Sequence, residues 1–273
     1  MASWLCPPRL RPPIGAIYWF ARTADDLADE GNAPPEQRLA DLADYRGDLF
    51  AVAQGQAPSG RWPQVFTPLA RALAEFALPT GLLADLLDAF VQDVQFTASG
   101  RRYADDAELH DYCRRSANPV GRLLLHLYGI TDAPALQQSD AICSALQLVN
   151  FWQDLSVDGP RHRHYVPQTD LAAHGLAVPF LTQGQDSPAS RRLVADLCAW
   201  ASDLMHQGAP LALRVPGRAG WELRLVVQGG LRILEKIARM DHAALSHRPT
   251  VGATDAPLLL WRAWRMGTER PRS

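Results

Sequence analysis

The stretch QLVNFWQDLSVD, residues 147–158, places two aspartates within a run of largely apolar residues that has helical spacing. Its polar side chains recur at intervals of three, four and four residues, which aligns them along one stripe of a helix: Gln147, Asn150, Asp154 and Asp158. The neighbours of this stripe are Leu, Val, Phe and Trp, whereas a solvated helix face would carry charged or small polar neighbours. Because a buried charge is costly unless it is compensated, the stretch indicates that something in the folded protein compensates the charge of its acids.

A second acidic stripe lies near the start of the chain, in IGAIYWFARTADDLAD at residues 14–29. Its polar residues fall on one line, at spacings of four, three and four, with Asp26 just beside it: Tyr18, Arg22, Asp25 and Asp29. An Arg22–Asp26 pair alone would be an ordinary surface contact worth roughly a few tenths of a kcal/mol. Two such stripes, both beside aromatic residues, favour a functional role over that simpler interpretation.

The two stripes together predict a metal site. Packing both faces against one another would bring carboxylates within about 4–6 Å, where like charges repel strongly. Divalent cations that bridge the faces relieve this repulsion, and oxygen-only ligands favour Mg²⁺ over Zn²⁺. Mg²⁺ held by few carboxylates often completes its ligand shell with phosphate oxygens. An apolar cavity below such a site would suit a diphosphate whose other end is a long hydrocarbon.

Helical spacing continues through most of the chain, and no alternation of β-branched residues indicates strands. Apolar periodicity, prolines at starts and glycines at ends predict helices at residues 13–30, 34–53, 64–77, 80–97, 106–116, 119–128, 134–158, 190–207, 221–245 and 256–266. Residues 161–188 are expected to be irregular. The sequence therefore predicts an all-α protein, one domain over residues 1–273 with about eight to ten helices and a frayed tail at 268–273.

Composition excludes several classes of protein. The net charge of −2 gives no reason to expect a nucleic acid or an anionic membrane as a partner. The start of the chain lacks the pattern of a signal peptide, and no window of about 18 apolar residues predicts a spanning helix. Four scattered cysteines without metal-ligand spacing favour free thiols in the cytoplasm. No GxGxxG motif follows a strand, so no NADPH site is expected.

Three motifs in order suggest a family: YWFARTADDLADE at 18–30, YCRRSANPVGRLLL at 112–125 and LQLVNFWQDLSVDGPRHRHYVP at 146–167. Together they resemble the squalene and phytoene synthase family of trans-isoprenoid head-to-head synthases, and the similarity covers nearly the whole chain. The resemblance implies an all-α isoprenoid-synthase bundle in which two aspartate-rich helices face one another above a central cavity. It also implies about two or three bound Mg²⁺ ions.

The second motif points to one branch of that family. In the relatives that condense two prenyl diphosphates it usually reads N-I-x-R-D-x-x-E-D, but here Gln153 and Val157 replace the arginine and the glutamate. The N-F-W-Q-D form resembles the branch that makes hydroxysqualene from presqualene diphosphate and water in bacterial hopanoid pathways. We interpret the missing arginine as suited to a site that handles one diphosphate.

The resemblance also assigns roles to individual residues. The implied metal ligands are Asp25, Asp26, Asp29, Asp154 and Asp158. The implied catalytic residues are Tyr18, Arg22, Tyr112, Gln147 and Asn150. The implied substrate-binding residues are Arg22, Phe20, Phe151, Arg163 and Tyr165. For each aromatic residue, packing in the core is the alternative to a contact with a carbocation.

The same resemblance implies a setting for the reaction. Its substrate would be a prenyl diphosphate, handed over by an upstream presqualene diphosphate synthase. We expect a cytoplasmic enzyme that makes transient contact with the inner membrane surface. Relatives cover the diphosphate with a segment ahead of Ala2, so either the start is shortened here or Ser3 and Trp4 act as the lid.

Several alternatives stay open. Within the enzyme class, the runner-up is condensation of two farnesyl or geranylgeranyl diphosphates. A different class is a catalytically silent assembly factor with the same fold, although the intact acids of both stripes weigh against it. The run His162-Arg163-His164 is expected to be exposed rather than to bind a metal. Residues 118–122, NPVGR, resemble a phosphate loop loosely, and a helix start is the better interpretation.

Overall fold

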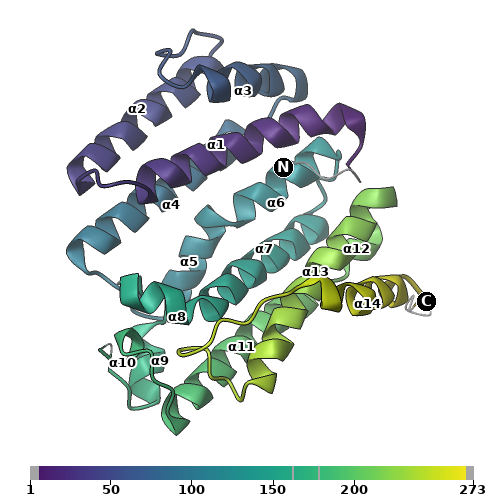
Figure 1. The fold of residues 1–273 in the computed structure, drawn as a ribbon. Coiled ribbons are helices and arrows are strands. Elements are labelled where there is room, and N and C mark those ends of the chain that lie inside the picture. The colour runs from purple at the N-terminus through teal and green to yellow at the C-terminus, as the bar shows by residue number, and fades with distance from the viewer. Residues whose placement is uncertain (1–5, 162, 178, 269–273) are drawn as a thin grey trace. The chain divides into compact units, whose positions relative to one another are not determined.

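The computed structural model describes residues 6–161, 163–177 and 179–268 (Figure 1). Every regular element within those ranges is a helix, so the all-α prediction is confirmed. The helices group into two compact units: residues 1–101 with 114–132, and residues 102–113 with 133–273. We describe each unit by itself. The single domain predicted over residues 1–273 and the cavity at its centre stay predictions.

The first unit contains the first acidic stripe. Its helices are η1 (Pro8–Leu10), α1 (Arg11–Asp29), α2 (Pro35–Ala53), α3 (Pro63–Phe76), α4 (Thr80–Ser99) and α6 (Asn118–Leu127). The helix α5 (Asp106–Ser116) passes from the second unit into the first. Because α6 begins at Asn118, the interpretation of residues 118–122 as a helix start is confirmed.

An aromatic cluster forms the centre of the first unit. The ring of Tyr45 lies 5.1 Å from Phe20, 4.7 Å from Phe66 and 5.0 Å from Trp62. The Tyr45 hydroxyl is buried with these rings and donates a hydrogen bond of 3.0 Å to the carbonyl of Phe20. This bond satisfies the Tyr45 hydroxyl and fixes α1 against α2.

The second unit contains the second acidic stripe. Its helices are α7 (Ala133–Gln153), α8 (Leu155–Asp158), η2 (Gly159–Arg161), α9 (Gln168–Ala173), α10 (Pro179–Thr182), α11 (Pro188–Gly208), α12 (Leu211–Arg214), α13 (Gly217–Arg239), η3 (Ala253–Asp255) and α14 (Ala256–Thr268). The four-residue helix α12 and the short helices α9 and α10 are absent from the prediction, which treated 161–188 as irregular.

The helices α7 and α11 lie side by side and form the main contact of the second unit (Figure 1). Gly208 at the end of α11 allows this close approach. A Cβ at this position would lie 2.5 Å from Cγ1 of Ile142 and 2.6 Å from the carbonyl oxygen of Gln138, both on α7. The packing therefore requires glycine here.

The helix expected to run from 134 to 158 is interrupted at Asp154, which corrects the predicted boundary. The break is local, because the Asp154 N–H still donates to the Asn150 carbonyl at 3.0 Å. The Asp154 carbonyl then accepts bonds of 2.8 Å from the N–H groups of Val157 and Asp158, which close the single turn of α8. Aspartate is a weak helix-interior residue, and its carboxylate here bonds to an arginine outside the helix.

The helix α13 ends earlier than predicted, at Arg239 instead of near 245. Asp241 and His242 adopt left-handed backbone conformations, with φ of 53° and 59°, and stop the helix. The segment that follows is irregular up to η3 and carries Arg248. Among the described residues, no helix is long and apolar enough to cross a bilayer.

Candidate active site

The first acidic stripe lies on α1 with its polar side chains outside the core. Arg22 joins two of the acids: its Nη1 lies 3.0 Å from Asp25 Oδ2 and its Nη2 lies 2.6 Å from Asp26 Oδ1. Tyr18 is 41% exposed, and Asp29 is also exposed. The guanidinium thus compensates the charge of these acids, and such a half-exposed pair contributes little to stability by itself.

Phe20, one of the predicted substrate-binding residues, lies in the core of the first unit. It has no exposed surface, and its ring packs against Tyr45 and Phe66. The helix turns Phe20 away from the Tyr18–Asp29 stripe, because residues two positions apart point to different sides of a helix. This corrects the expected substrate contact: the alternative of core packing fits Phe20.

The second acidic stripe runs along α7 and α8 despite the break between them. Asn150 is exposed, while Gln147, Asp154 and Asp158 are half-buried. Asp154 binds Arg248 through both carboxylate oxygens, with Nε at 2.5 Å from Oδ1 and Nη2 at 3.3 Å from Oδ2. The charge of Asp154 is therefore compensated by an arginine that sequence reasoning did not identify.

Asp158 carries the clearest electrostatic signature of the stripe. Burial, and next the charge of Asp154, raise the pKa of Asp158 to about 6, whereas Arg161 and Arg248 act in the opposite direction. A carboxyl group in such a setting loses its proton at higher pH than an exposed aspartate does, and added positive charge would lower its pKa again. Perturbed acids of this kind are typical of functional sites.

An aromatic group gathers beside Asp158 in the second unit. The rings of Phe151 and Tyr165 stack at 3.7 Å with an angle of 8° between them. Tyr112 lies 6.2 Å from Phe151 and 6.1 Å from Tyr165. Tyr103, which the sequence did not single out, lies 5.6 Å from Tyr112. Three of the predicted aromatic residues are thus brought together by elements far apart in the sequence.

A small pocket connects this aromatic group with the second stripe. Its walls include Phe151, Asp158, Arg163, His164 and Tyr165. The backbone N–H of Arg163 donates to the Asp158 carbonyl at 3.1 Å, which fixes the loop that bears Arg163. Arg163 and His164 are half-buried, which corrects the expected exposure of this run; His162 lies outside the described residues, as do Ser3 and Trp4.

The glycine after the second motif also has a structural role. Gly159 lies against α10, where a Cβ would sit 2.4 Å from the carbonyl oxygen of Leu181. Leu181 is a wall of the same pocket. The close approach that Gly159 permits therefore closes one side of the pocket.

The donor chemistry of the acids fits Mg²⁺. Each predicted ligand is a carboxylate, most of them half-buried, so water and phosphate oxygens could complete an octahedral shell. Within residues 6–161, 163–177 and 179–268, no group of three or more His, Cys, Asp or Glu side chains is clustered as a metal site. In the structure Arg22 and Arg248 supply the positive charge that a metal would bring.

Comparison with known proteins places these features in a family. A profile of the squalene/phytoene synthase family matches residues 1–255. The chain is 35% identical over 243 residues to a hydroxysqualene synthase of Rhodopseudomonas palustris, which covers 88% of this chain and 79% of that protein. A presqualene diphosphate synthase of the same organism is 31% identical over 175 residues, 64% of this chain and 60% of that protein.

A solved structure agrees with the sequence relatives. The squalene synthase HpnC from Alicyclobacillus acidocaldarius superposes with a TM-score of 0.79 and 33% sequence identity, over 88% of this chain and 87% of that one. Both the length matched by the family profile and the identity to these relatives establish the kinship. The chain therefore belongs to the squalene/phytoene synthase family of isoprenoid synthases.

Proposed function

We propose that the protein converts presqualene diphosphate and water to hydroxysqualene and diphosphate, with Mg²⁺ as cofactor. The observation that carries this proposal is the second motif, in which Gln153 stands where condensing relatives carry arginine. The similarity to hydroxysqualene synthases supports the same branch. A site with one arginine fewer suits a substrate with one diphosphate group.

Binding of the diphosphate would fall to the two acidic stripes. Asp25, Asp26, Asp29, Asp154 and Asp158 would hold Mg²⁺, and bound Mg²⁺ would draw negative charge from the diphosphate. Arg22 and Arg248 each have a guanidinium group beside these acids. The forked N–H groups of a guanidinium match the geometry of phosphate oxygens. Gln147 and Asn150 would orient oxygens at the second stripe through their amide groups.

The hydrocarbon would meet the aromatic group. When the C–O bond to diphosphate breaks, its electron pair leaves with the diphosphate and a carbocation remains. The faces of Tyr112, Phe151 and Tyr165 would stabilise that cation by roughly 1–2 kcal/mol each where water is excluded. After rearrangement, the oxygen of water bonds to an allylic carbon and one proton passes to solvent. Water, rather than hydride from NADPH, would thus end the reaction.

Product analysis tests the proposal. The purified protein is incubated with Mg²⁺ and either presqualene diphosphate or farnesyl diphosphate, and the products are separated by chromatography. We expect hydroxysqualene from presqualene diphosphate, with a two-mass-unit shift in H₂¹⁸O because the hydroxyl comes from water. Consumption of farnesyl diphosphate while presqualene diphosphate stays untouched would overturn the proposal.

Condensation of two prenyl diphosphates is the second candidate. The similarity to a presqualene diphosphate synthase favours it, although that match covers less of both chains than the match to the hydroxysqualene synthase. The same assay separates the candidates, because only condensation consumes farnesyl diphosphate. A silent assembly factor would leave both substrates unchanged.

A further inference from the structure

Arg248, which binds the second stripe, lies on an irregular segment that polar contacts hold at its beginning, middle and end. We name residues 246–252 the strap; it leads from the turn after α13 toward η3. Arg248 lies within the strap and binds Asp154. Its side chain is 46% exposed, and an ion pair so open to solvent holds an arginine weakly by itself. The position of the strap backbone therefore decides where the guanidinium lies.

The beginning of the strap is fixed by Asp186. The Ser246 hydroxyl donates to Asp186 Oδ2, and the backbone N–H of Leu245 lies 3.4 Å from Asp186 Oδ1. These contacts hold the chain two residues before Arg248.

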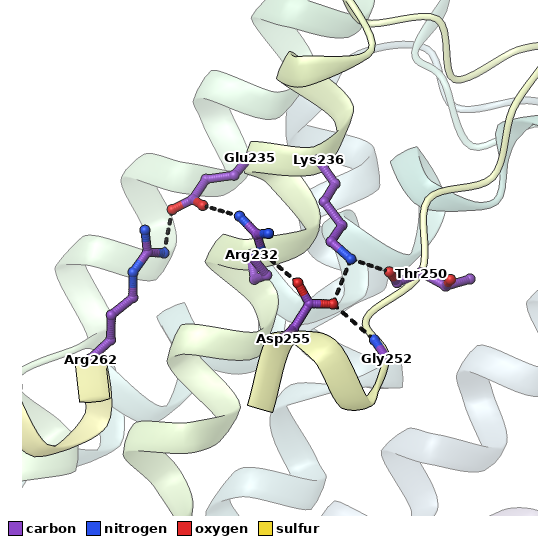
Figure 2. A network of polar contacts seen from close by, with 7 residues as sticks. All are labelled: Arg232, Glu235, Lys236, Thr250, Gly252, Asp255 and Arg262. Atoms are coloured by element: carbon purple, nitrogen blue, oxygen red, sulfur yellow. Dashed lines mark hydrogen bonds and ion pairs between the residues drawn. The ribbon is translucent and has the colours of Figure 1, made fainter. Parts of the chain in front are cut away.

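The end of the strap is fixed by an ion network on α13, shown in Figure 2. Lys236 Nζ donates to the Thr250 carbonyl at 2.7 Å and lies 2.5 Å from Asp255 Oδ2. The same carboxylate oxygen accepts the Gly252 N–H at 2.9 Å. Arg232 Nε lies 2.8 Å from Asp255 Oδ1, and Glu235 links Arg232 with Arg262 of α14. Asp255 is 3% exposed, so the anchor is buried.

The middle of the strap is fixed by Gln153. Its Nε2 donates to the Pro249 carbonyl at 2.7 Å, and this carbonyl directly follows Arg248 in the chain. Gln153 also precedes Asp154, the partner of Arg248. Two adjacent residues at the end of α7 thus hold two adjacent residues of the strap, one through a backbone atom and one through a side chain.

We propose that Gln153 is a positioning residue: by holding the Pro249 carbonyl it keeps the Arg248 guanidinium at the second acidic stripe, where it binds the diphosphate. This inference rests on the proposed function only in assigning a diphosphate to the stripe. An arginine at 153 would set a second guanidinium beside Arg248 and repel it. A neutral donor at this position leaves the ion pair between Arg248 and Asp154 undisturbed.

A double-mutant cycle on ligand affinity tests the proposal. Binding of inorganic diphosphate with Mg²⁺ is measured by calorimetry for the wild type, Gln153→Met, Arg248→Gln and the double variant. Methionine keeps the length of glutamine and removes the donor. We expect Gln153→Met to weaken binding about 5- to 20-fold, and to have less than about a twofold effect once Arg248 is replaced, because coupled residues are not additive.

A matched control distinguishes positioning from general damage. Gln138 lies on the same helix, is half-buried and has its Oε1 3.5 Å from Nη1 of Arg214. Gln138→Met should leave diphosphate affinity unchanged. If Gln153→Met fails to fold, as judged by circular dichroism, Gln153→Ala takes its place in the cycle.

The outcomes separate this inference from the proposed function. The positioning role would be overturned if Gln153→Met weakened binding equally in the wild type and in the Arg248→Gln background. Unchanged affinity in Gln153→Met alone would overturn it too. A wild type that binds no diphosphate would overturn it as well. The identity of the prenyl substrate does not enter this measurement, so a failure of the proposed reaction shows only in the product assay.

Discussion

Asp154 stands at the break between α7 and α8 and binds Arg248 with both carboxylate oxygens. Replacing Asp154 with asparagine keeps its shape and removes the negative charge that a divalent cation requires. We expect Asp154→Asn to lower kcat/KM by roughly 100-fold or more, since a lost metal ligand removes transition-state charge stabilisation. Steady-state kinetics with presqualene diphosphate measures the effect.

The control for that experiment is Asp196→Asn. Asp196 is 75% exposed at its side chain and pairs with His174, so its charge should not affect turnover. Equal activity of Asp154→Asn and the wild type would show that Asp154 is not a metal ligand.

Asp158 predicts a pH dependence of stability. Its pKa is raised from the ordinary value of 3.8 to about 6, so the folded state binds its proton more tightly than the unfolded chain does. The tighter proton binding of the folded state adds to the free energy of unfolding. This gain is fully present below pH 3.8 and is lost as the pH rises through about 6. The change in the free energy of unfolding caused by Asp158→Asn, relative to the wild type, should therefore be more favourable at pH 7 than at pH 4. We expect a difference of roughly 1 kcal/mol after allowance for partial exposure.

Urea unfolding of the wild type and Asp158→Asn at pH 4 and pH 7 measures this difference. The charged groups that set it are Asp154, Arg161 and Arg248. A difference between the two proteins that is the same at both pH values would contradict the raised pKa.

At the level of single residues, the sequence predicted what periodicity can reveal. Asp154 and Asp158 recur at helical spacing, so their shared stripe follows from the chain itself. Arg248 and Tyr103 have no such signal. Arg248 lies in the strap and Tyr103 in the irregular segment before α5, and the paths of both segments depend on tertiary packing. Phe20 shows the reverse error, since an aromatic beside a functional stripe fits a core or a substrate site equally well.

The contact between α7 and α11 predicts a large effect from one added methyl group. In Gly208→Ala the new Cβ would meet Cγ1 of Ile142 at 2.5 Å and the Gln138 carbonyl oxygen at 2.6 Å. Backbone cannot yield as a side chain can, so we expect a loss of roughly 2–3 kcal/mol in the free energy of unfolding. Denaturant titration followed by circular dichroism measures it.

Gly229→Ala is the matched comparison, on α13. A Cβ at Gly229 meets nothing within 4 Å, so alanine should stabilise the helix by about 0.5–1 kcal/mol. Similar effects of the two substitutions would show that α7 and α11 do not pack as closely as described.

At the level of elements, the long amphipathic helices follow from the sequence and the short ones do not. The bounds of α2 and α5 agree closely with their periodicity and capping signals. The turns α9, α10 and α12 have four to six residues, too few to establish a period. The break at Asp154 was missed because the hydrogen bonds on both sides of it keep the helical spacing of side chains.

The proposed function assigns acids of both acidic stripes to the binding of Mg²⁺ and diphosphate. Asp25 belongs to the first unit and Asp154 to the second. If these acids bind Mg²⁺ and diphosphate, the ligands should stabilise the folded chain by about 2.7 kcal/mol at one hundred times Kd. Either Asp25→Asn or Asp154→Asn alone should abolish most of this rise in Tm, as thermal unfolding with and without ligands would show.

Asp44→Asn serves as the control, because Asp44 is an exposed acid of the first unit that pairs with Arg61. It should keep the full rise in Tm. A full rise in Tm in either test variant would contradict the role of the substituted aspartate in ligand binding.

For the whole molecule, the family was accessible from the sequence because three motifs occur in order along the chain. The division into two compact units was not predicted, because the chain passes between them around residues 101, 113 and 132 and no single linker separates them. Domain boundaries are visible in sequence mainly where a linker is exposed and polar. Here one helix, α5, spans one of the crossings.

Lys236 makes the strap accessible to chemical measurement. It is the only lysine of the 273 residues, so an acylating reagent has one lysine side chain to modify. Its ammonium group is held by Asp255 and the Thr250 carbonyl, and it must leave both to react. The rate of acylation, followed by mass spectrometry, would therefore report how often the strap opens. The chain thus carries its own single-site probe of the segment that presents Arg248.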